Sequence, residues 1–248
     1  MISKQHIKFI KSLQYKKYRK KANAFLVEGS KSVLELVTSD FQVQSITATS
    51  RFYTEFGDRI PESVAVCYET DESTLSQMGT FQSNDYVLAV ASMAKQRELI
   101  IGPGERLIAL QDLQDPGNLG TIIRTADWYG MNKILVSQDT VDFYNPKVIS
   151  ATKGSFTRVQ VHNLGISAFL RNNPQLNVYG TFMDGDSLYN IRIEAPAIIV
   201  FGNESRGIDN ELAELINRKV MIPRVGNAES LNVAIAAAIV MDHMSRPR

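Results

Sequence analysis

The 248-residue sequence has one cysteine, Cys67, and three histidines, His6, His162 and His243. One cysteine cannot form a disulfide within the chain, which indicates a reducing compartment. The histidines lie far apart, with no cysteine or carboxylate at ligand spacing, so we expect no metal site. Small aliphatic residues surround Cys67, which favours a buried, inert side chain over a nucleophile.

Long hydrophobic runs are also missing. The apolar stretch 231–241 is too short to cross a bilayer, which takes about 20 residues. The start, MISKQHIKFIKSLQ, lacks the apolar core and the cleavage site of a signal peptide. With 44% hydrophobic and 21% charged residues, the composition is typical of a globular protein. We therefore expect a soluble cytoplasmic protein that has no membrane partner.

Several catalytic signatures do not occur in the sequence. It contains no GxxxxGK[ST] phosphate loop, no GxGxxG motif after a strand and no GxSxG nucleophile elbow. These absences disfavour nucleotide hydrolases, serine hydrolases and methyltransferases of the Rossmann type.

Positive charge is concentrated at the N-terminus, although the formal net charge is only +1. Residues 1–21 contain no acidic side chain and eight basic ones: Lys4, Lys8, Lys11, Lys16, Lys17, Arg19, Lys20 and Lys21. Tyr15 and Tyr18 lie among these bases and offer stacking surfaces for nucleotides. The pattern is compatible with an RNA-binding patch at Lys16, Lys17, Arg19, Lys20 and Lys21, or with an ordinary solvated helix face.

The chain divides into two α/β halves. Short apolar strands at 25–27, 43–48, 64–68 and 86–91 alternate with helical patterns, which predicts a small domain over 1–94. Charged residues and Gly-Pro-Gly make 95–105 a linker. In 106–248, the apolar strands expected at 107–110, 134–136, 159–161, 178–182, 197–201 and 220–222 are typical of a parallel sheet covered on both faces.

Three segments carry polar residues just after strands of this second domain, where open parallel sheets bind ligands. The first, DPGNLGTIIRTA at 115–126, leads into a helix, with Asn118 as the expected N-cap and Arg124 in its second turn. In the second, IVFGNESRGI at 199–208, a strand ends at Gly202 and Glu204 follows in a loop. A missing side chain at Gly202 would let a ligand approach the backbone.

The third segment, VMIPRVGNAESLNVA at 220–234, runs from a strand through a polar loop into an apolar helix. Ser230 is a plausible cap for this helix. Asn232 is a polar residue at the start of an otherwise apolar helix, and therefore needs a partner. Taken singly, each segment also fits an ordinary capped helix or turn.

Together and in this order, the segments resemble motifs 1, 2 and 3 of the SpoU (TrmH-like) branch of the SPOUT RNA methyltransferases. Those motifs have the forms DPxNxGxIxRTA, GxExxG after a strand, and IPM followed by SLNVxxA. The stretch 145–155 and the N-terminal part 8–37, with FLVEG, are similar to family segments too, the latter to an RNA substrate-binding domain. Two residues depart from the pattern: Arg224 stands where methionine is usual, and Lys153 replaces a smaller residue.

The resemblance implies a parallel-sheet α/β domain with a deep trefoil knot, a homodimer, and S-adenosylmethionine (AdoMet) as cofactor. By motif position, Gly202, Ile222 and Leu231 are expected to line the AdoMet pocket. The expected catalytic residues are Arg124, which acts at the ribose, and Asn118, Glu204, Ser230 and Asn232, which hold the nucleotide and the loops.

The implied reaction is transfer of the methyl group of AdoMet to a ribose 2′-hydroxyl of RNA. The accessory N-terminal domain favours ribosomal RNA as the partner over tRNA. The alternatives are a methyltransferase that acts on tRNA ribose or on a base, and a catalytically idle RNA-binding protein of ribosome assembly.

Overall fold

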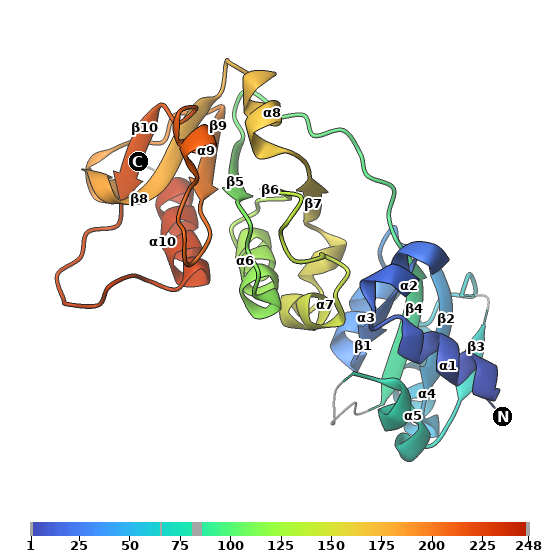
Figure 1. Ribbon diagram of the computed structural model, residues 1–248. Helices are drawn as coiled ribbons and strands as arrows, with labels where there is room; N and C mark the ends of the chain where they lie inside the picture. The colour runs from blue at the N-terminus through green and yellow to red at the C-terminus, as the bar shows by residue number, and fades with distance from the viewer. Residues whose placement is uncertain (1, 65, 81–85, 247–248) are drawn as a thin grey trace. The chain divides into compact units, whose positions relative to one another are not determined.

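The computed structural model describes residues 2–64, 66–80 and 86–246. The chain forms two compact units (Figure 1). The first unit comprises Met1–Lys95 and Asp142–Arg158, and the second comprises Gln96–Val141 and Val159–Arg248.

The first unit is built on a four-stranded sheet in the order β1-β4-β2-β3. Strand β4 is antiparallel to both β1 and β2, whereas β2 and β3 run parallel. Side chains that alternate along β1 fill two cores, one with Phe25 and Val27 and the other with Ala24 and Leu26. The strands are β1 (Ala24–Glu28), β2 (Val43–Ala48), β3 (Cys67–Glu69) and β4 (Val87–Ser92), and the helices are α1 (Lys4–Ser12), α2 (Lys16–Ala22), α3 (Ser30–Val37), α4 (Ser50–Phe56) and α5 (Glu72–Met78).

Strand β3 differs from the expectation. It begins at Cys67, whereas the sequence predicted a strand over 64–68, of which residue 65 lies outside the described residues. The prediction that Cys67 is buried is wrong, because its side chain is exposed. The physical reason is that β3 is a three-residue strand at the edge of the sheet, with only β2 as its neighbour.

The segment Asp142–Arg158 packs with the first unit, although it follows strand β6 (Lys133–Val136) of the second unit in the sequence. Its helix α7 (Pro146–Thr152) packs against β1. Ile149 and Phe156 are buried in the same core as Phe25, and the Phe25 and Phe156 rings meet edge to face at 6.0 Å. The sequence-based domain boundaries at 94 and 106 did not predict that residues 142–158 belong to the first unit. The assignment of a function to each domain stays a prediction.

The second unit holds a six-stranded sheet in the order β10-β8-β9-β5-β6-β7. All neighbouring strands are parallel, which confirms the predicted architecture. All five residues of β9 are buried, as its continuous apolar sequence predicts. The strands are β5 (Arg106–Leu110), β6 (Lys133–Val136), β7 (Gln160–Asn163), β8 (Asn177–Ser187), β9 (Ala197–Phe201) and β10 (Arg218–Met221), and the helices are α6 (Pro116–Trp128), α8 (Ile166–Arg171), α9 (Asn210–Ala213) and α10 (Val233–Ser245).

Strand β8 is the longest strand and continues past the expected 178–182. Its pairing with β10 shifts register between Lys219 and Val220. Beyond this shift, the last residues of β10 pair with Asp186 and Ser187 near the end of β8. The trefoil knot that the resemblance implies stays a prediction. Among the described residues, no helix is both long and apolar enough to cross a membrane.

Candidate active site

The first motif begins helix α6 just after β5. Asp115 is the N-cap, and its side chain accepts a hydrogen bond of 2.7 Å from the backbone N–H of Asn118. The prediction that Asn118 caps this helix is therefore wrong. Pro116 occupies the first turn, where its fixed φ angle suits a helix start, so the cap falls on the residue before it. As a result, the side-chain amide of Asn118 is free to bind elsewhere.

The second motif forms a closed turn after β9. The backbones of Asn203 and Gly207 exchange two hydrogen bonds of 3.0 and 2.9 Å. The Asn203 side chain accepts from the N–H of Ser205 at 2.9 Å and donates to the Asp112 carbonyl at 2.8 Å. Sequence reasoning missed Asn203, whose place directly after a strand-ending glycine is typical of such a side-chain-stabilised turn.

Gly202 is required by this turn itself. A Cβ at this position would lie 2.2 Å from the carbonyl carbon of Gly207 and 2.3 Å from the nitrogen of Ile208. The sequence predicted that the missing side chain makes room for a ligand, whereas the atoms that approach the Gly202 backbone belong to the protein's own chain. A larger residue would open the turn, so a substitution here does not test ligand binding alone.

The third motif leads into helix α10, whose N-cap is Asn232. The Asn232 Oδ1 atom accepts a hydrogen bond of 2.9 Å from the backbone N–H of Ala234. The prediction that Ser230 caps this helix is wrong, because the first helical residue is Val233 and Ser230 lies too far upstream. Ser230 is exposed and lines the cavity described below.

Hydrogen bonds between side chains join the three motifs. The Asn232 Nδ2 atom donates to Asn118 Oδ1 at 3.0 Å. The Asn118 Nδ2 atom in turn donates to Glu204 Oε1 at 3.3 Å. Asn118 therefore links the motif 2 loop to the start of α10. Both hydrogen bonds of this network are donated in the direction of the Glu204 carboxylate.

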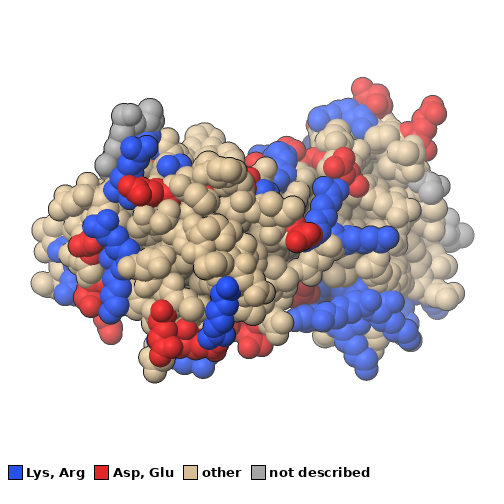
Figure 2. Space-filling model, turned by 90° about the horizontal axis from the view of Figure 1, so that it is seen from above, with Lys and Arg blue, Asp and Glu red and all other residues tan. Residues whose placement is uncertain are grey.

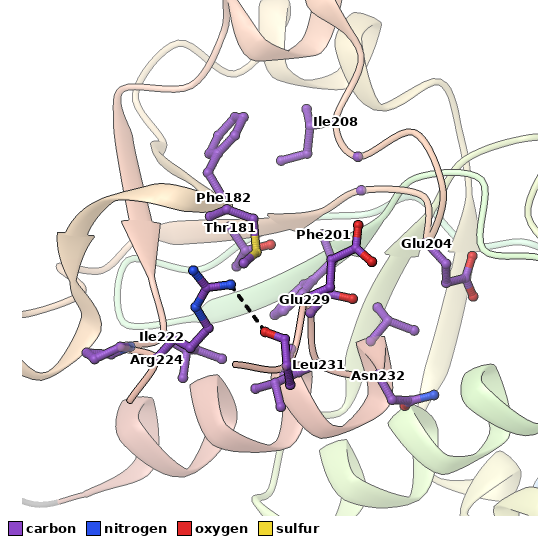
Figure 3. Close-up of a pocket in the computed structure, with 18 of the residues that line it drawn as sticks. Thr181, Phe182, Phe201, Glu204, Ile208, Ile222, Arg224, Glu229, Leu231 and Asn232 are labelled. Atoms are coloured by element: carbon purple, nitrogen blue, oxygen red, sulfur yellow. Dashed lines mark hydrogen bonds between the residues drawn. The ribbon is translucent and has the colours of Figure 1, made fainter. Parts of the chain in front are cut away.

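A cavity of about 740 Å³ opens beside this network (Figure 3). Its lining contains the three residues expected at the cofactor, Gly202, Ile222 and Leu231. Three of the expected catalytic residues line it as well: Glu204, Ser230 and Asn232. The remaining lining comes from the middle of β8, the end of β9 and the turn after Gly202, the loop that follows β10, and α10: Thr181, Phe182, Met183, Phe201, Asn203, Gly207, Ile208, Pro223, Arg224, Val225, Gly226, Ala228, Glu229, Val233 and Ala236.

The chemistry of this lining suits a nucleoside that carries charged groups. The volume lies within the range of about 300–1,000 Å³ that is usual for small-molecule sites. Phe201, Ile222 and Leu231 provide apolar walls, and Arg224 and Glu229 bring one charge of each sign. Among the described residues, no backbone N–H of the loop 224–231 donates to another backbone group, so these donors remain for solvent or a ligand.

Strand β8 supplies a wall that sequence reasoning missed, formed by Thr181, Phe182 and Met183. The length of β8 was underestimated, because its second half is partly exposed and carries charged residues. The useful signal would have been its position, since the ends of parallel strands gather at one edge of the sheet.

Arg124 takes no part in the hydrogen-bond network that joins the three motifs. It is exposed on α6, does not line the cavity, and has no hydrogen-bond partner among the described residues. Trp128, one helical turn further, is 83% exposed. On α10, which packs against α6, the apolar Ile235 is 52% exposed. Arg124 therefore lies on an exposed face of α6 that also carries Trp128.

The basic N-terminal residues separate into two groups. Lys16, Lys17, Lys20 and Lys21 are exposed on α2, beside the exposed rings of Tyr15 and Tyr18. None of these four lysines forms an ion pair with another described residue. In Figure 2, Lys and Arg side chains gather at the lower right of the view with few acidic groups among them, whereas the two signs are mixed over the rest of this face.

Arg19, on the same helix, is only 2% exposed, which removes it from the expected RNA-binding residues. Its guanidinium donates to the carbonyls of Leu13 and Gln14 at 2.9 and 2.8 Å, and to Asp142 Oδ2 at 2.5 Å. Arg19 faces inward because these acceptors compensate its buried charge. Its role is to fix the turn between α1 and α2 to the segment that begins at Asp142.

Comparison with known proteins agrees with the geometry. A model described as the SpoU rRNA Methylase family matches residues 105–242, and one described as the MRM3-like substrate binding domain matches residues 4–89. The 23S rRNA (guanosine(2553)-2′-O)-methyltransferase RlmP of Bacillus subtilis (strain 168) is 32% identical over 247 residues, which cover 97% of this chain and 96% of the relative.

Solved structures extend the likeness to the whole fold. A Porphyromonas gingivalis protein described as a putative RNA methyltransferase of the TrmH family superposes with a TM-score of 0.88 at 35% identity, over 98% of both chains. An AdoMet-bound rRNA methyltransferase from Sinorhizobium meliloti gives a TM-score of 0.88 at 26% identity, over 98% of this chain and 96% of that chain. The chain thus belongs to the SpoU/TrmH family of AdoMet-dependent RNA 2′-O-ribose methyltransferases.

Proposed function

We propose that this protein transfers the methyl group of AdoMet to a ribose 2′-hydroxyl of 23S ribosomal RNA, and that the cavity after β9 and β10 is its cofactor site. The observation that carries this assignment is the hydrogen-bonded chain Asn232–Asn118–Glu204 at the edge of the cavity. It brings polar groups from all three motifs to one place, where a ribose can meet a bound cofactor.

AdoMet supplies a methyl group that its sulfonium activates for displacement. The apolar side chains of Ile222 and Leu231, with unpaired backbone groups of the 224–231 loop, would hold the adenosine part. Asn118, Glu204 and Asn232 would bind the target nucleotide by hydrogen bonds and fix its 2′-oxygen in line with the methyl group. Ser230 lines the same cavity and would contribute its hydroxyl.

Arg124 would act as a cationic clamp. Arginine keeps its proton at neutral pH because its pKa is above 12, so it suits binding of a phosphate and stabilisation of the developing 2′-alkoxide better than proton removal. Since Arg124 does not line the cavity of its own chain, we propose that it completes the site of a second subunit. The exposed side chains of Trp128 on α6 and Ile235 on α10, two helices that pack together, would lie in the surface that pairs in this homodimer.

Complementation between two inactive variants tests this arrangement. Arg124→Ala and Asn232→Ala chains are co-expressed with different affinity tags, and the heterodimer is purified through both tags. If Arg124 acts in the partner's site, one of the two sites is intact and about half of the wild-type rate returns, since the two sites of a symmetric dimer are equivalent. An inactive heterodimer would show that Arg124 acts within its own chain.

The choice of ribosomal RNA rests on the similarity to RlmP, which spans both units. Action on this substrate would place the protein in the cytoplasm. The exposed lysines of α2 would hold RNA, while the second unit carries out the chemistry. Mapping of 2′-O-methyl positions in ribosomal RNA and tRNA, with and without the gene, tests the substrate. Loss of a site in tRNA alone would favour the tRNA enzyme instead.

A further inference from the structure

Arg224 is the cationic side chain in the lining of the cavity, and it stands where the family pattern has methionine. Figure 3 shows its guanidinium extending from the loop after β10 into the cavity. A single hydrogen bond of 3.2 Å runs from Nη1 to the carbonyl of Ala228. A guanidinium has five N–H donors, so most of them remain available for an anionic ligand.

Glu229 contributes the opposite charge. It lines the same cavity, and in Figure 3 its carboxylate points into the open space between β8 and α10. Arg224 and Glu229 form no ion pair with each other or with another described residue. Two opposite charges that do not neutralise each other, beside an apolar wall, are complementary to a zwitterion joined to a flat, uncharged ring system.

AdoMet has this distribution of charge. Its adenine and ribose are uncharged, its amino-acid end carries a carboxylate and an ammonium, and a cationic sulfonium joins the two parts. We propose that Arg224 binds the carboxylate of AdoMet and that Glu229 accepts a hydrogen bond from the ammonium, so that these two side chains select cofactors with an intact amino-acid end. This inference rests on the proposed cofactor site, and it concerns only the recognition of one end of the ligand.

A purely structural role for Arg224 makes a different prediction. If Arg224 only braces its loop through Ala228, its removal weakens binding of every adenosine ligand alike. If it binds the carboxylate, the loss is confined to ligands that carry this group. A set of three ligands separates the two roles: S-adenosylhomocysteine, its decarboxylated analogue, and 5′-methylthioadenosine, which lacks the whole amino-acid end.

The experiment measures the affinity of each ligand by calorimetry for the wild type, Arg224→Met and Glu229→Gln. Arg206→Met is the matched control, because it removes the same charge from the neighbouring loop without touching the cavity lining. A charged hydrogen bond is worth about 1.5–3 kcal/mol, so we expect Arg224→Met to weaken S-adenosylhomocysteine about 10- to 100-fold. Binding of the other two ligands should change less than about twofold, within ordinary measurement scatter.

Glu229→Gln should weaken the two ligands that carry an ammonium and leave 5′-methylthioadenosine unchanged. Equal losses for all three ligands in Arg224→Met, or no loss for any, would overturn the inference while the cofactor site stands. The Leu231→Glu variant tests the cofactor site itself, because it places a charge in the apolar wall. If this variant binds S-adenosylhomocysteine as tightly as the wild type does, the proposed cofactor site is wrong.

Discussion

Asn232 performs two tasks with the two ends of one amide, and substitutions can separate them. Its Oδ1 caps α10 through Ala234, and its Nδ2 donates to Asn118. Asn232→Ala removes both contacts. Loss of the cap should lower the free energy of unfolding by about 0.5–2 kcal/mol. Asn232→Asp retains a cap of equal quality, and its negative charge at a helix N-terminus is favourable by about 0.3–1 kcal/mol.

The aspartate variant should nevertheless lose activity. In the wild type, both hydrogen bonds of the network point toward Glu204, which accepts from Asn118. With aspartate at 232, Asn118 lies between two carboxylates that only accept. Its single NH₂ group cannot satisfy both in the native geometry, so one bond is lost. Removing a hydrogen bond to a charged group costs about 1.5–3 kcal/mol, which corresponds to roughly a 10- to 100-fold slower methyl transfer.

Urea denaturation and single-turnover methyl transfer from labelled AdoMet measure the two effects. The matched control is Asp71→Ala, which removes the N-cap of α5 in the first unit. It should reduce stability as Asn232→Ala does, and leave the methyl-transfer rate unchanged. Wild-type turnover in a stable Asn232→Asp protein would refute the role assigned to the network. A stability loss in Asn232→Asp equal to that of Asn232→Ala would refute the assignment of the cap.

Three further predictions concern other parts of the molecule. Arg124→Ala should slow methyl transfer about a thousandfold while calorimetry finds cofactor affinity unchanged, because the residue acts on the nucleotide; turnover within tenfold of wild type would contradict this role. Arg19→Met should lower the free energy of unfolding by about 3–5 kcal/mol, because it leaves the Asp142 carboxylate largely buried and unpaired. Lys20→Met, at an exposed position of the same helix, should have almost no effect. Equal, small losses of stability in the two variants would show that the buried ion pair is unimportant. The last prediction concerns the exposed α2 lysines Lys16, Lys17, Lys20 and Lys21. Their reversal to glutamate should flatten the slope of log K for RNA binding against log salt by about 2–3 units, at about 0.7–0.9 per phosphate contact. Parallel lines for wild type and variant would mean that these lysines do not contact RNA.

The sequence by itself determined the architecture of the second unit and part of the lining of its cavity. A continuous apolar run such as Ala197–Phe201 is typical of a parallel strand covered on both faces, and this run is buried as expected. The polar residues that follow these strands gather at one edge of the sheet, since parallel strands share their direction. The motif resemblance predicted Glu204, Ser230 and Asn232 as site residues, and all three line the cavity.

The tertiary structure alone decided what individual polar residues do. In the sequence, nothing distinguishes Arg19 from the basic residues around it. Its burial depends on its hydrogen bonds to the carbonyls of the α1–α2 turn and to the Asp142 carboxylate, 123 residues away. Local pattern likewise could not show that Asn232 both caps α10 and binds Asn118, or that Gly202 is needed for the turn that contacts Gly207. These roles depend on partners that the fold brings together, because burial and hydrogen bonding are properties of the assembled chain.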